Sequence, residues 1–271
     1  MKQFTILIAL FLITTISAQD LDTIINVGNY NMHFIIKKGT KSPIIFESGS
    51  GNDATVWNDI IDSISKKTNA TIITYDRVGY GNSHILSKDK NNKHGILNNV
   101  IALEKSLMKL GFNRNLTFVS HSLGGFYTRL FSSRNPKKVK QVVFLDASIP
   151  SFYTKNFMNR MNLIMSSDFI NKVKQSSLGM YYELLNINET VELLRKIKFP
   201  KSIPVLSLEA SVAFNPLNNE NDALRWKQSH KEFTSKFSNR KSIEIEKTSH
   251  YIFKSKPQII IKEIADYYNT K

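Results

Sequence analysis

Residues 116–125 place a serine where a buried strand is expected to turn into a helix. Their sequence is Leu-Thr-Phe-Val-Ser-His-Ser-Leu-Gly-Gly, so an apolar run ends just before Ser122, and Gly124 and Gly125 follow it. So tight a turn needs small residues around the central serine and holds its hydroxyl exposed, in strained backbone geometry. The first N–H groups of the helix then point at the same place, where they can stabilise an oxyanion. The pattern predicts a nucleophile at Ser122.

This stretch resembles the nucleophile elbow of the α/β-hydrolase superfamily, whose motif is Gly-x-Ser-x-Gly, commonly followed by a second glycine. Ser120 stands in place of the first glycine, and serine is small enough to be tolerated there. Residues 76–83, Asp-Arg-Val-Gly-Tyr-Gly-Asn-Ser, resemble the Asp-Arg-x-Gly-x-Gly-x-Ser loop of the same superfamily. We expect Asp76 and Arg77 to fix that loop rather than to perform chemistry.

The resemblance makes His250 the expected base. Residues 248–252, Thr-Ser-His-Tyr-Ile, follow the last expected strand and resemble the superfamily's Gly-His segment. The chain order, serine first and histidine later, also fits the superfamily. Imidazole titrates near neutral pH, so His250 can accept the Ser122 proton and later donate it to the leaving group.

A glycine-rich loop at residues 48–51, Ser-Gly-Ser-Gly, follows the expected strand at residues 43–47. It occupies the place of the superfamily's His-Gly oxyanion loop, with Ser48 instead of the histidine. Glycines let the backbone approach a substrate closely. The resemblance therefore implies that the backbone N–H groups of Ser50 and Leu123 hold the oxyanion.

Three carboxylates compete for the role of the acid that orients the base. The superfamily usually carries the acid a few residues past a later strand, but residues 210–214, which take that place, contain no carboxylate. We favour Asp146, because it ends the strand that follows the nucleophile helix and some superfamily members carry the acid there. Asp222 is the second candidate, although it begins an expected helix and would serve there as a cap. Glu209 is the third.

Short apolar runs alternate with stretches of helical periodicity along most of the chain. This predicts an α/β fold with a mostly parallel central sheet flanked by helices, and ligand sites at the carboxyl ends of the strands. After an opening hairpin at residues 23–37, strands are expected at residues 43–47, 71–75, 116–120, 141–145, 204–208 and 242–245. Helices are expected at residues 54–65, 97–110, 123–133, 221–237 and 257–268.

The alternation stops at residues 151–201, here called the lid segment, where the pattern predicts two or more amphipathic helices. Four of the seven methionines of the chain lie in it. Methionine and aromatic side chains adapt to apolar ligands, so the segment is expected to form a helical lid over an apolar acyl group. These methionines are Met158, Met161, Met165 and Met180.

The first residues resemble a secretory signal peptide, with Lys2 followed by an apolar run and the small residues Ser17 and Ala18. We expect residues 1–18 to be removed, leaving a single α/β-hydrolase domain at residues 19–271 that is secreted or periplasmic. No second apolar run of this kind follows, so stable membrane insertion is not expected.

Composition excludes several classes of site. The chain has no cysteine, which rules out disulfides, a thiolate nucleophile and cysteine-bound zinc. Its 37 Lys and Arg residues exceed its 22 Asp and Glu residues, for a formal net charge of +15. These basic residues are spread along the chain and form no run that marks a nucleic-acid site, so no nucleic-acid partner is expected.

The predicted function is ester hydrolysis through an acyl-serine intermediate, on a small-molecule ester and with no metal or organic cofactor. An amidase or aminopeptidase with the same triad is an alternative. A binding protein that keeps this fold without turnover is another, because one fold hosts many functions. Dehalogenase and epoxide hydrolase chemistry is disfavoured, since those relatives use aspartate where this chain has Ser122. No feature of the sequence sets an oligomeric state.

Overall fold

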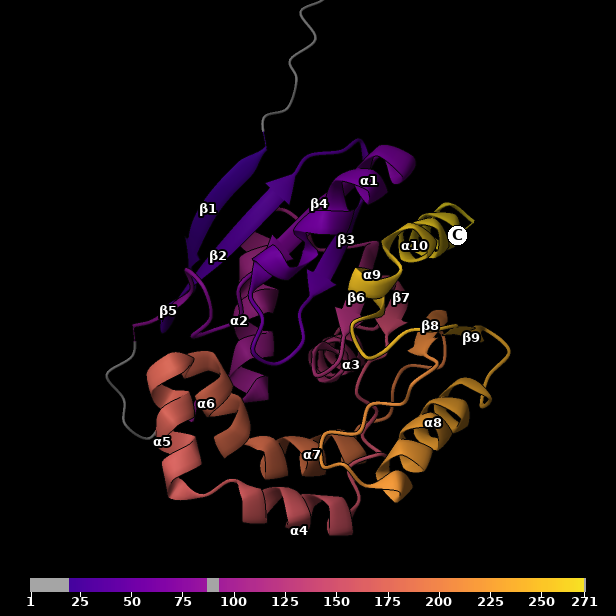
Figure 1. Ribbon diagram of the computed structural model, residues 1–271. Helices are drawn as coiled ribbons and strands as arrows, with labels where there is room; N and C mark the ends of the chain where they lie inside the picture. The colour runs from indigo at the N-terminus through magenta and orange to yellow at the C-terminus, as the bar shows by residue number, and fades with distance from the viewer. Residues whose placement is uncertain (1–19, 87–92, 271) are drawn as a thin grey trace, which may run out of the picture.

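A computed structural model describes residues 20–86 and 93–270 (Figure 1). The expected signal peptide, residues 1–18, lies outside the described residues. Within them, nine strands form one sheet in the order β1-β2-β4-β3-β6-β7-β8-β9, and β5 pairs with β2. The strands are β1 (Leu21–Asn26), β2 (Tyr30–Lys37), β3 (Lys41–Glu47), β4 (Ala70–Tyr75), β5 (His84–Ile85), β6 (Leu116–His121), β7 (Val139–Leu145), β8 (Val205–Ala210) and β9 (Arg240–Ile245).

The sheet is mostly parallel, as the sequence predicts. The opening hairpin of β1 and β2 is antiparallel, and β2 also runs antiparallel to β4. From β4 onward, every neighbouring pair of the sheet path is parallel, which brings the carboxyl ends of these strands to one edge. That edge is where parallel sheets bind ligands.

Helices cover both faces of the sheet (Figure 1). Residues of α1 (Asn58–Thr68), α9 (Ile252–Ser255) and α10 (Pro257–Asn269) share one apolar core with the sheet. Residues of α2 (Ile96–Lys109), α3 (Gly124–Arg134) and α8 (Glu220–Thr234) share the other. None of the helices in the described part of the chain is long and apolar enough to span a membrane.

The central strand β6 shows why the chain forms this sheet. Every residue of β6 is buried, and successive side chains of a strand point to opposite faces. Phe118 accordingly belongs to the core that contains Phe131 of α3, whereas Val119 belongs to the core that contains Ile60 of α1. A strand covered on both faces reads as a continuous apolar run, which is the pattern the sequence carries.

The lid segment contains four short helices, α4 (Lys155–Ile164), α5 (Ser167–Ser176), α6 (Leu178–Leu185) and α7 (Ile187–Lys196), which form a layer of their own in Figure 1. Three of them begin at a hydroxyl that accepts a hydrogen bond from a backbone N–H of the first turn. The capping residues are Thr154, Ser166 and Ser177. These caps fix where each helix starts and divide the segment into separate helices.

The expected strands and helices all have counterparts, and two further elements were not expected. The strand β5 has two residues, and α9 has four. Neither is long enough to show a hydrophobic period. The helix expected at residues 54–65 begins as a 3-10 turn, η1 (Ala54–Trp57), and α1 continues to Thr68, where Asn69 ends it with a φ of 54°.

Candidate active site

Ser122 lies in the turn between β6 and α3 with a φ of 51°, a value that L-residues seldom adopt. The chain can turn so sharply because glycines follow. A Cβ on Gly124 would lie 2.5 Å from the Glu47 backbone oxygen, and one on Gly125 would lie 2.9 Å from the Ala147 Cβ. Close packing of the start of α3 against the ends of β3 and β7 therefore requires both glycines. The turn leaves Ser122 partly exposed.

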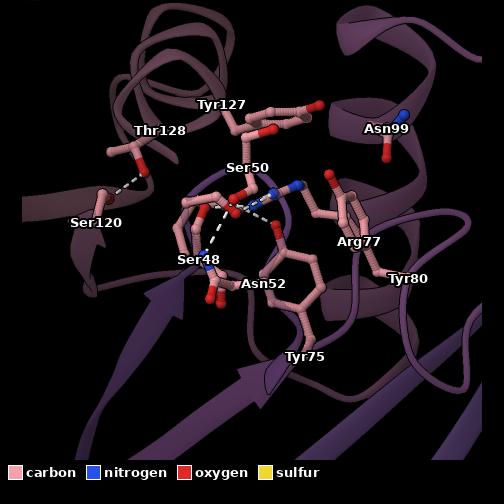
Figure 2. Close-up of polar contacts among 12 residues, drawn as sticks. Ser48, Ser50, Asn52, Tyr75, Arg77, Tyr80, Asn99, Ser120, Tyr127 and Thr128 are labelled. Carbon is pink, nitrogen blue, oxygen red and sulfur yellow. Dashed lines mark hydrogen bonds and ion pairs between the residues drawn. The ribbon is translucent and has the colours of Figure 1, made fainter. Parts of the chain in front are cut away.

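Ser120 departs from the Gly-x-Ser-x-Gly pattern and is accommodated by its neighbour on α3. Its buried hydroxyl lies 2.5 Å from the Thr128 Oγ1, and the two form a hydrogen bond (Figure 2). The hydroxyl thus fills space that a first glycine would leave open and satisfies its own hydrogen bond there.

Ser122, His250 and Asp146 form one chain of hydrogen bonds. The Ser122 hydroxyl donates to His250 Nε2 at 2.8 Å, and His250 Nδ1 donates to Asp146 Oδ2 at 2.7 Å. Three loops supply these side chains, each beyond the carboxyl end of a parallel strand: Ser122 follows β6, His250 follows β9 and Asp146 follows β7. Fourteen per cent of the His250 side chain is exposed against 1% of the Asp146 side chain, so the histidine is partly accessible to solvent whereas the aspartate is buried.

The second oxygen of Asp146 is also held. Its Oδ1 accepts hydrogen bonds from Trp226 Nε1 at 3.1 Å and from the Ala210 backbone N–H at 3.2 Å. Burial alone would raise the pKa of Asp146, but the hydrogen bond and the charge of His250 outweigh burial and hold that pKa below its ordinary value. Asp146 is therefore ionised at neutral pH.

The other two candidate acids lie elsewhere. Asp222, on α8, accepts a hydrogen bond from Arg160 Nη2 at 2.5 Å. Glu209, on β8, accepts one from the Ser242 hydroxyl at 2.6 Å. Neither forms a hydrogen bond with His250 in the described part of the chain, so the structure brings only Asp146 of the three to the base.

Two aromatic residues beside His250 were not singled out from the sequence. The Phe214 ring stacks on the imidazole with centroids 4.0 Å apart and planes 23° apart. His121 Nε2 lies 3.0 Å from the His250 backbone oxygen. Burial, followed by the charge of His250, lowers the pKa of His121 to about 3. His121 is therefore neutral and donates its Nε2 proton to that carbonyl.

The loop after β3 lies directly against the nucleophile turn. A Cβ on Gly49 would be 3.1 Å from the Ser122 Cβ. Ser48, in place of the family's histidine, accepts a hydrogen bond from Trp57 Nε1 at 2.9 Å and donates one to the Asp53 backbone oxygen at 3.0 Å. These bonds fix the loop at its start.

The expected oxyanion donors, Ser50 and Leu123, belong to the two segments that meet where Gly49 approaches Ser122. Ser50 belongs to the loop after β3, and Leu123 directly follows the nucleophile. In residues 20–86 and 93–270, neither backbone N–H donates to another backbone group. Both groups are therefore left for another acceptor.

Arg77 holds the same loop through its guanidinium group, which reaches toward Ser48 and Ser50 in Figure 2. Its Nη2 donates to the Gly49 backbone oxygen at 2.7 Å, and its Nη1 donates to the Ser48 backbone oxygen and, at 2.7 Å, to Glu47. Burial would lower the pKa of Arg77, but Glu183 and Glu47 outweigh burial and raise it. The guanidinium is thus a fixed positive charge bound to the backbone oxygens of the loop.

Asp76 fixes the neighbouring turn, in keeping with the structural part expected for it. Its Oδ1 accepts the Ala54 backbone N–H, and its Oδ2 accepts the Asn82 backbone N–H, each at 2.8 Å. His33 Nδ1 also lies 2.8 Å from Oδ2.

The methionines of the lid segment divide into two groups. Met158, Met161 and Met165 pack against the large core on the α3 face of the sheet. Met180 lies at the site, because a Cβ on Gly51 of the loop after β3 would be 3.8 Å from its sulfur. No group of three or more His, Asp or Glu side chains within the described residues is arranged to hold a metal ion.

Comparison with curated proteins gives distant relatives that match part of the chain. It is 25% identical over 134 residues to the uncharacterized protein YbdG of Bacillus subtilis (strain 168), covering 48% of this chain and 39% of that protein. It is 26% identical over 106 residues to a (lyso)-N-acylphosphatidylethanolamine lipase of Bos taurus, covering 39% of this chain and 30% of the lipase. The matches thus span well under half the length of either relative.

Solved structures match over nearly the whole chain. The haloalkane dehalogenase DatA of Agrobacterium tumefaciens C58 superposes with a TM-score of 0.67 at 16% identity, covering 93% of this chain and 97% of that one. At this identity the likeness establishes a shared fold. The family model described as alpha/beta hydrolase fold matches residues 42–183, slightly more than half of the sequence. The chain therefore belongs to the α/β-hydrolase fold family.

Proposed function

We propose that this protein is a serine hydrolase that cleaves carboxylic esters of small or apolar substrates through an acyl-serine intermediate. The observation that carries the proposal is the unbroken chain from the Ser122 hydroxyl through His250 to Asp146, at 2.8 Å and 2.7 Å. A nucleophile in hydrogen-bond contact with a base, and a base oriented by a third group, is the arrangement that activates a serine.

In the proposed first half-reaction, His250 Nε2 takes the hydroxyl proton while Ser122 Oγ bonds to the carbonyl carbon of the ester. The carbonyl oxygen becomes an oxyanion that the backbone N–H groups of Ser50 and Leu123 stabilise. Asp146 holds the imidazole in the required tautomer and stabilises the imidazolium. The carbon–oxygen bond to the alcohol then breaks, and His250 returns its proton to the departing alcohol.

In the second half-reaction, water replaces the alcohol. His250 removes a proton from the water as its oxygen bonds to the acyl carbon, and the bond to Ser122 Oγ breaks with return of the proton to the serine. The products are the carboxylic acid and the alcohol, and the enzyme is restored. Apart from the ester and water, this scheme uses only side chains and backbone groups of the chain.

The substrate class is proposed from the lid segment and one relative. Met180, whose sulfur would lie 3.8 Å from a Cβ on Gly51, gives the site an adaptable apolar contact. The relative from Bos taurus is named a lipase, which favours ester substrates. An aspartate nucleophile, which the dehalogenase members of this fold use, is replaced here by Ser122. We therefore propose esters, rather than amides or halides, as the substrates. We also propose that the lid segment covers an apolar acyl group.

Export is part of the proposal. The apolar run and small residues of positions 1–18 favour a cleaved signal peptide and a secreted or periplasmic enzyme. N-terminal sequencing of the enzyme recovered from outside the cytoplasm tests this, and a mature N-terminus at Gln19 is expected. An intact N-terminus would contradict cleavage.

Covalent labelling tests the chemistry without a guessed substrate. A fluorophosphonate is expected to label the wild type, with the adduct on the peptide that contains Ser122. Ser122→Ala should abolish labelling while the circular dichroism spectrum stays unchanged. The matched control is Ser167→Ala, because Ser167 is an exposed serine of α5 outside the site. Labelling that persists in Ser122→Ala would remove Ser122 from the mechanism.

A chain-length series tests the substrate class. Rates on aryl esters with acyl chains of increasing length are expected to peak at short to medium chains. Equal rates along the series, or faster cleavage of aminoacyl amides than of esters, would favour the amidase alternative.

A further inference from the structure

The carboxylate of Glu183, on α6, lies against the loop after β3 that contains Ser50. Its Oε2 accepts hydrogen bonds from Ser50 Oγ and Tyr80 OH, both at 2.6 Å. Its Oε1 accepts one from Arg77 Nε at 3.0 Å and one from Tyr127 OH at 3.1 Å. The side chain is only 6% exposed. A buried charge needs such partners, and all four donors lie outside the lid segment.

Arg77 links Glu183 to the expected oxyanion donor, the Ser50 N–H, through a single peptide unit. Arg77 Nη2 donates to the Gly49 backbone oxygen at 2.7 Å, and that carbonyl shares its peptide unit with the Ser50 N–H. A peptide unit is planar and trans, so fixing the oxygen fixes the opposite direction in which the N–H points. A cation on the carbonyl also polarises the unit and strengthens the N–H as a donor.

Glu183 has a larger part in balancing Arg77 than the second carboxylate beside it. Glu47 also contacts the guanidinium, at 2.7 Å, but it is fully buried, and burial raises its pKa. Both carboxylates raise the pKa of Arg77, and the charge of Glu183 does so more than that of Glu47. Of the two, only Glu183 belongs to the lid segment.

Two glycines, Gly179 of α6 and Gly79 of residues 76–83, bring the helix into close contact with that loop. The Gly179 N–H donates to the Gly79 backbone oxygen at 2.9 Å. A Cβ on Gly179 would lie 2.2 Å from the Tyr80 ring, and one on Gly79 would lie 2.8 Å from the Gly179 nitrogen. Only glycine at these two positions lets the helix approach so closely. Glu183, one turn further along α6, then reaches the loop.

We propose that Glu183 is a positioning residue that orients the Ser50 N–H through Arg77 and through the Ser50 side chain. The oxyanion site is then complete only while α6 is seated against residues 76–83. This inference rests on the proposed function, because it concerns the oxyanion of that reaction. Glu183 touches no reacting atom in this scheme.

The test measures ester turnover per active site, counted by fluorophosphonate titration, so that misfolded molecules do not lower the rate. Glu183→Ala is expected to lower kcat by about 10-fold to 100-fold, less than removal of an oxyanion donor itself, with KM changed by less than about 3-fold. Glu183→Gln keeps the hydrogen-bond acceptor but not the charge, and its kcat should be intermediate. A role confined to folding would change the number of titrated sites instead.

Two further variants sharpen the test. Ser50→Ala removes one hydroxyl contact but keeps the backbone N–H, so a smaller loss is expected, and the double variant with Glu183→Ala should lose no more than Glu183→Ala alone. Glu189→Ala is the matched control, because Glu189 is an exposed lid carboxylate paired with Lys93 on the surface. Its kcat should equal that of the wild type.

The outcomes separate the two proposals. Absence of labelling in the wild type would overturn the serine hydrolase mechanism and this inference with it. A labelled wild type with an unchanged kcat in Glu183→Ala would overturn the inference alone. If Glu183→Ala does not fold, Glu183→Gln decides in the same way, and a kcat equal to that of the wild type rejects the positioning role.

Discussion

The indole N–H of Trp226 donates to Asp146 Oδ1 at 3.1 Å, while Oδ2 of the same carboxylate faces His250 at 2.7 Å. The Ala210 backbone N–H binds Oδ1 as well, at 3.2 Å. With both oxygens engaged, the carboxylate cannot rotate away from the imidazole. Partners that fix an acid in this way determine how well it orients its base.

Trp226→Phe is expected to lower kcat by about tenfold, because hydrogen bonds to charged groups contribute about 1.5–3 kcal/mol and part of this orients Asp146. The measurement is ester turnover per titrated active site. Phe233→Leu, which shrinks another buried aromatic side chain of α8, controls for lost packing and should leave kcat near that of the wild type. Equal losses in the two variants would contradict a specific role of the indole.

Asp146→Asn should lower kcat by about 10⁴-fold, because the amide keeps the shape but neither holds the required tautomer nor stabilises the imidazolium. Asp222→Asn and Glu209→Gln should change kcat little, since these carboxylates bind Arg160 and Ser242 instead of the base. Steady-state kinetics on one ester compares the three variants. A large loss in Asp222→Asn with little in Asp146→Asn would reassign the acid.

Ser120→Ala should reduce the free energy of unfolding by about 1–3 kcal/mol, because it leaves the buried Thr128 hydroxyl without its partner. Urea denaturation measures this. Thr128→Val should cost a similar amount, and the double variant should be less destabilised than the sum of the single ones, since it leaves neither hydroxyl buried alone. Strictly additive losses would mean that the two hydroxyls do not support each other.

His33 should make stability depend on pH. Burial lowers its pKa, but hydrogen bonds to Asp76 and Asp22 outweigh burial and raise the pKa above the ordinary 6.5. The stabilisation is therefore complete below about pH 6.5, the unfolded value, and is lost as the pH rises through the folded pKa. Urea denaturation across this range should show the wild type losing its advantage over His33→Gln at higher pH. His84→Gln, at an exposed histidine, should show no such change.

Local patterns predicted most of the fold and part of the candidate site. Strands such as β6 are continuous apolar runs, because both of their faces are covered, and such runs are visible in a single sequence. The position of Ser122 between an apolar run and two glycines is equally local. Asp146 was favoured from its place at a strand end, which the parallel topology brings to the edge that carries the nucleophile.

Contacts between distant residues could not be predicted in this way. Trp226 meets Asp146 across 80 positions, and Arg77 meets Glu183 across 106. Nothing near either residue in the sequence specifies its partner, because the partner is chosen by how helices pack on the sheet. The lid segment was expected to cover an apolar acyl group, yet its Glu183 accepts hydrogen bonds from four polar side chains beside the loop after β3. A single acidic residue in an otherwise apolar helix was the signal, and its importance depends on where α6 packs.

The spacing of the triad along the chain bears on the newly synthesised protein. Ser122 and His250 are 128 positions apart, and His250 follows β9, the final strand to be synthesised. A nascent polypeptide therefore exposes its serine long before it has a proton acceptor. Under the proposed function, the polypeptide has no esterase activity until β9 joins the sheet and His250 reaches Ser122.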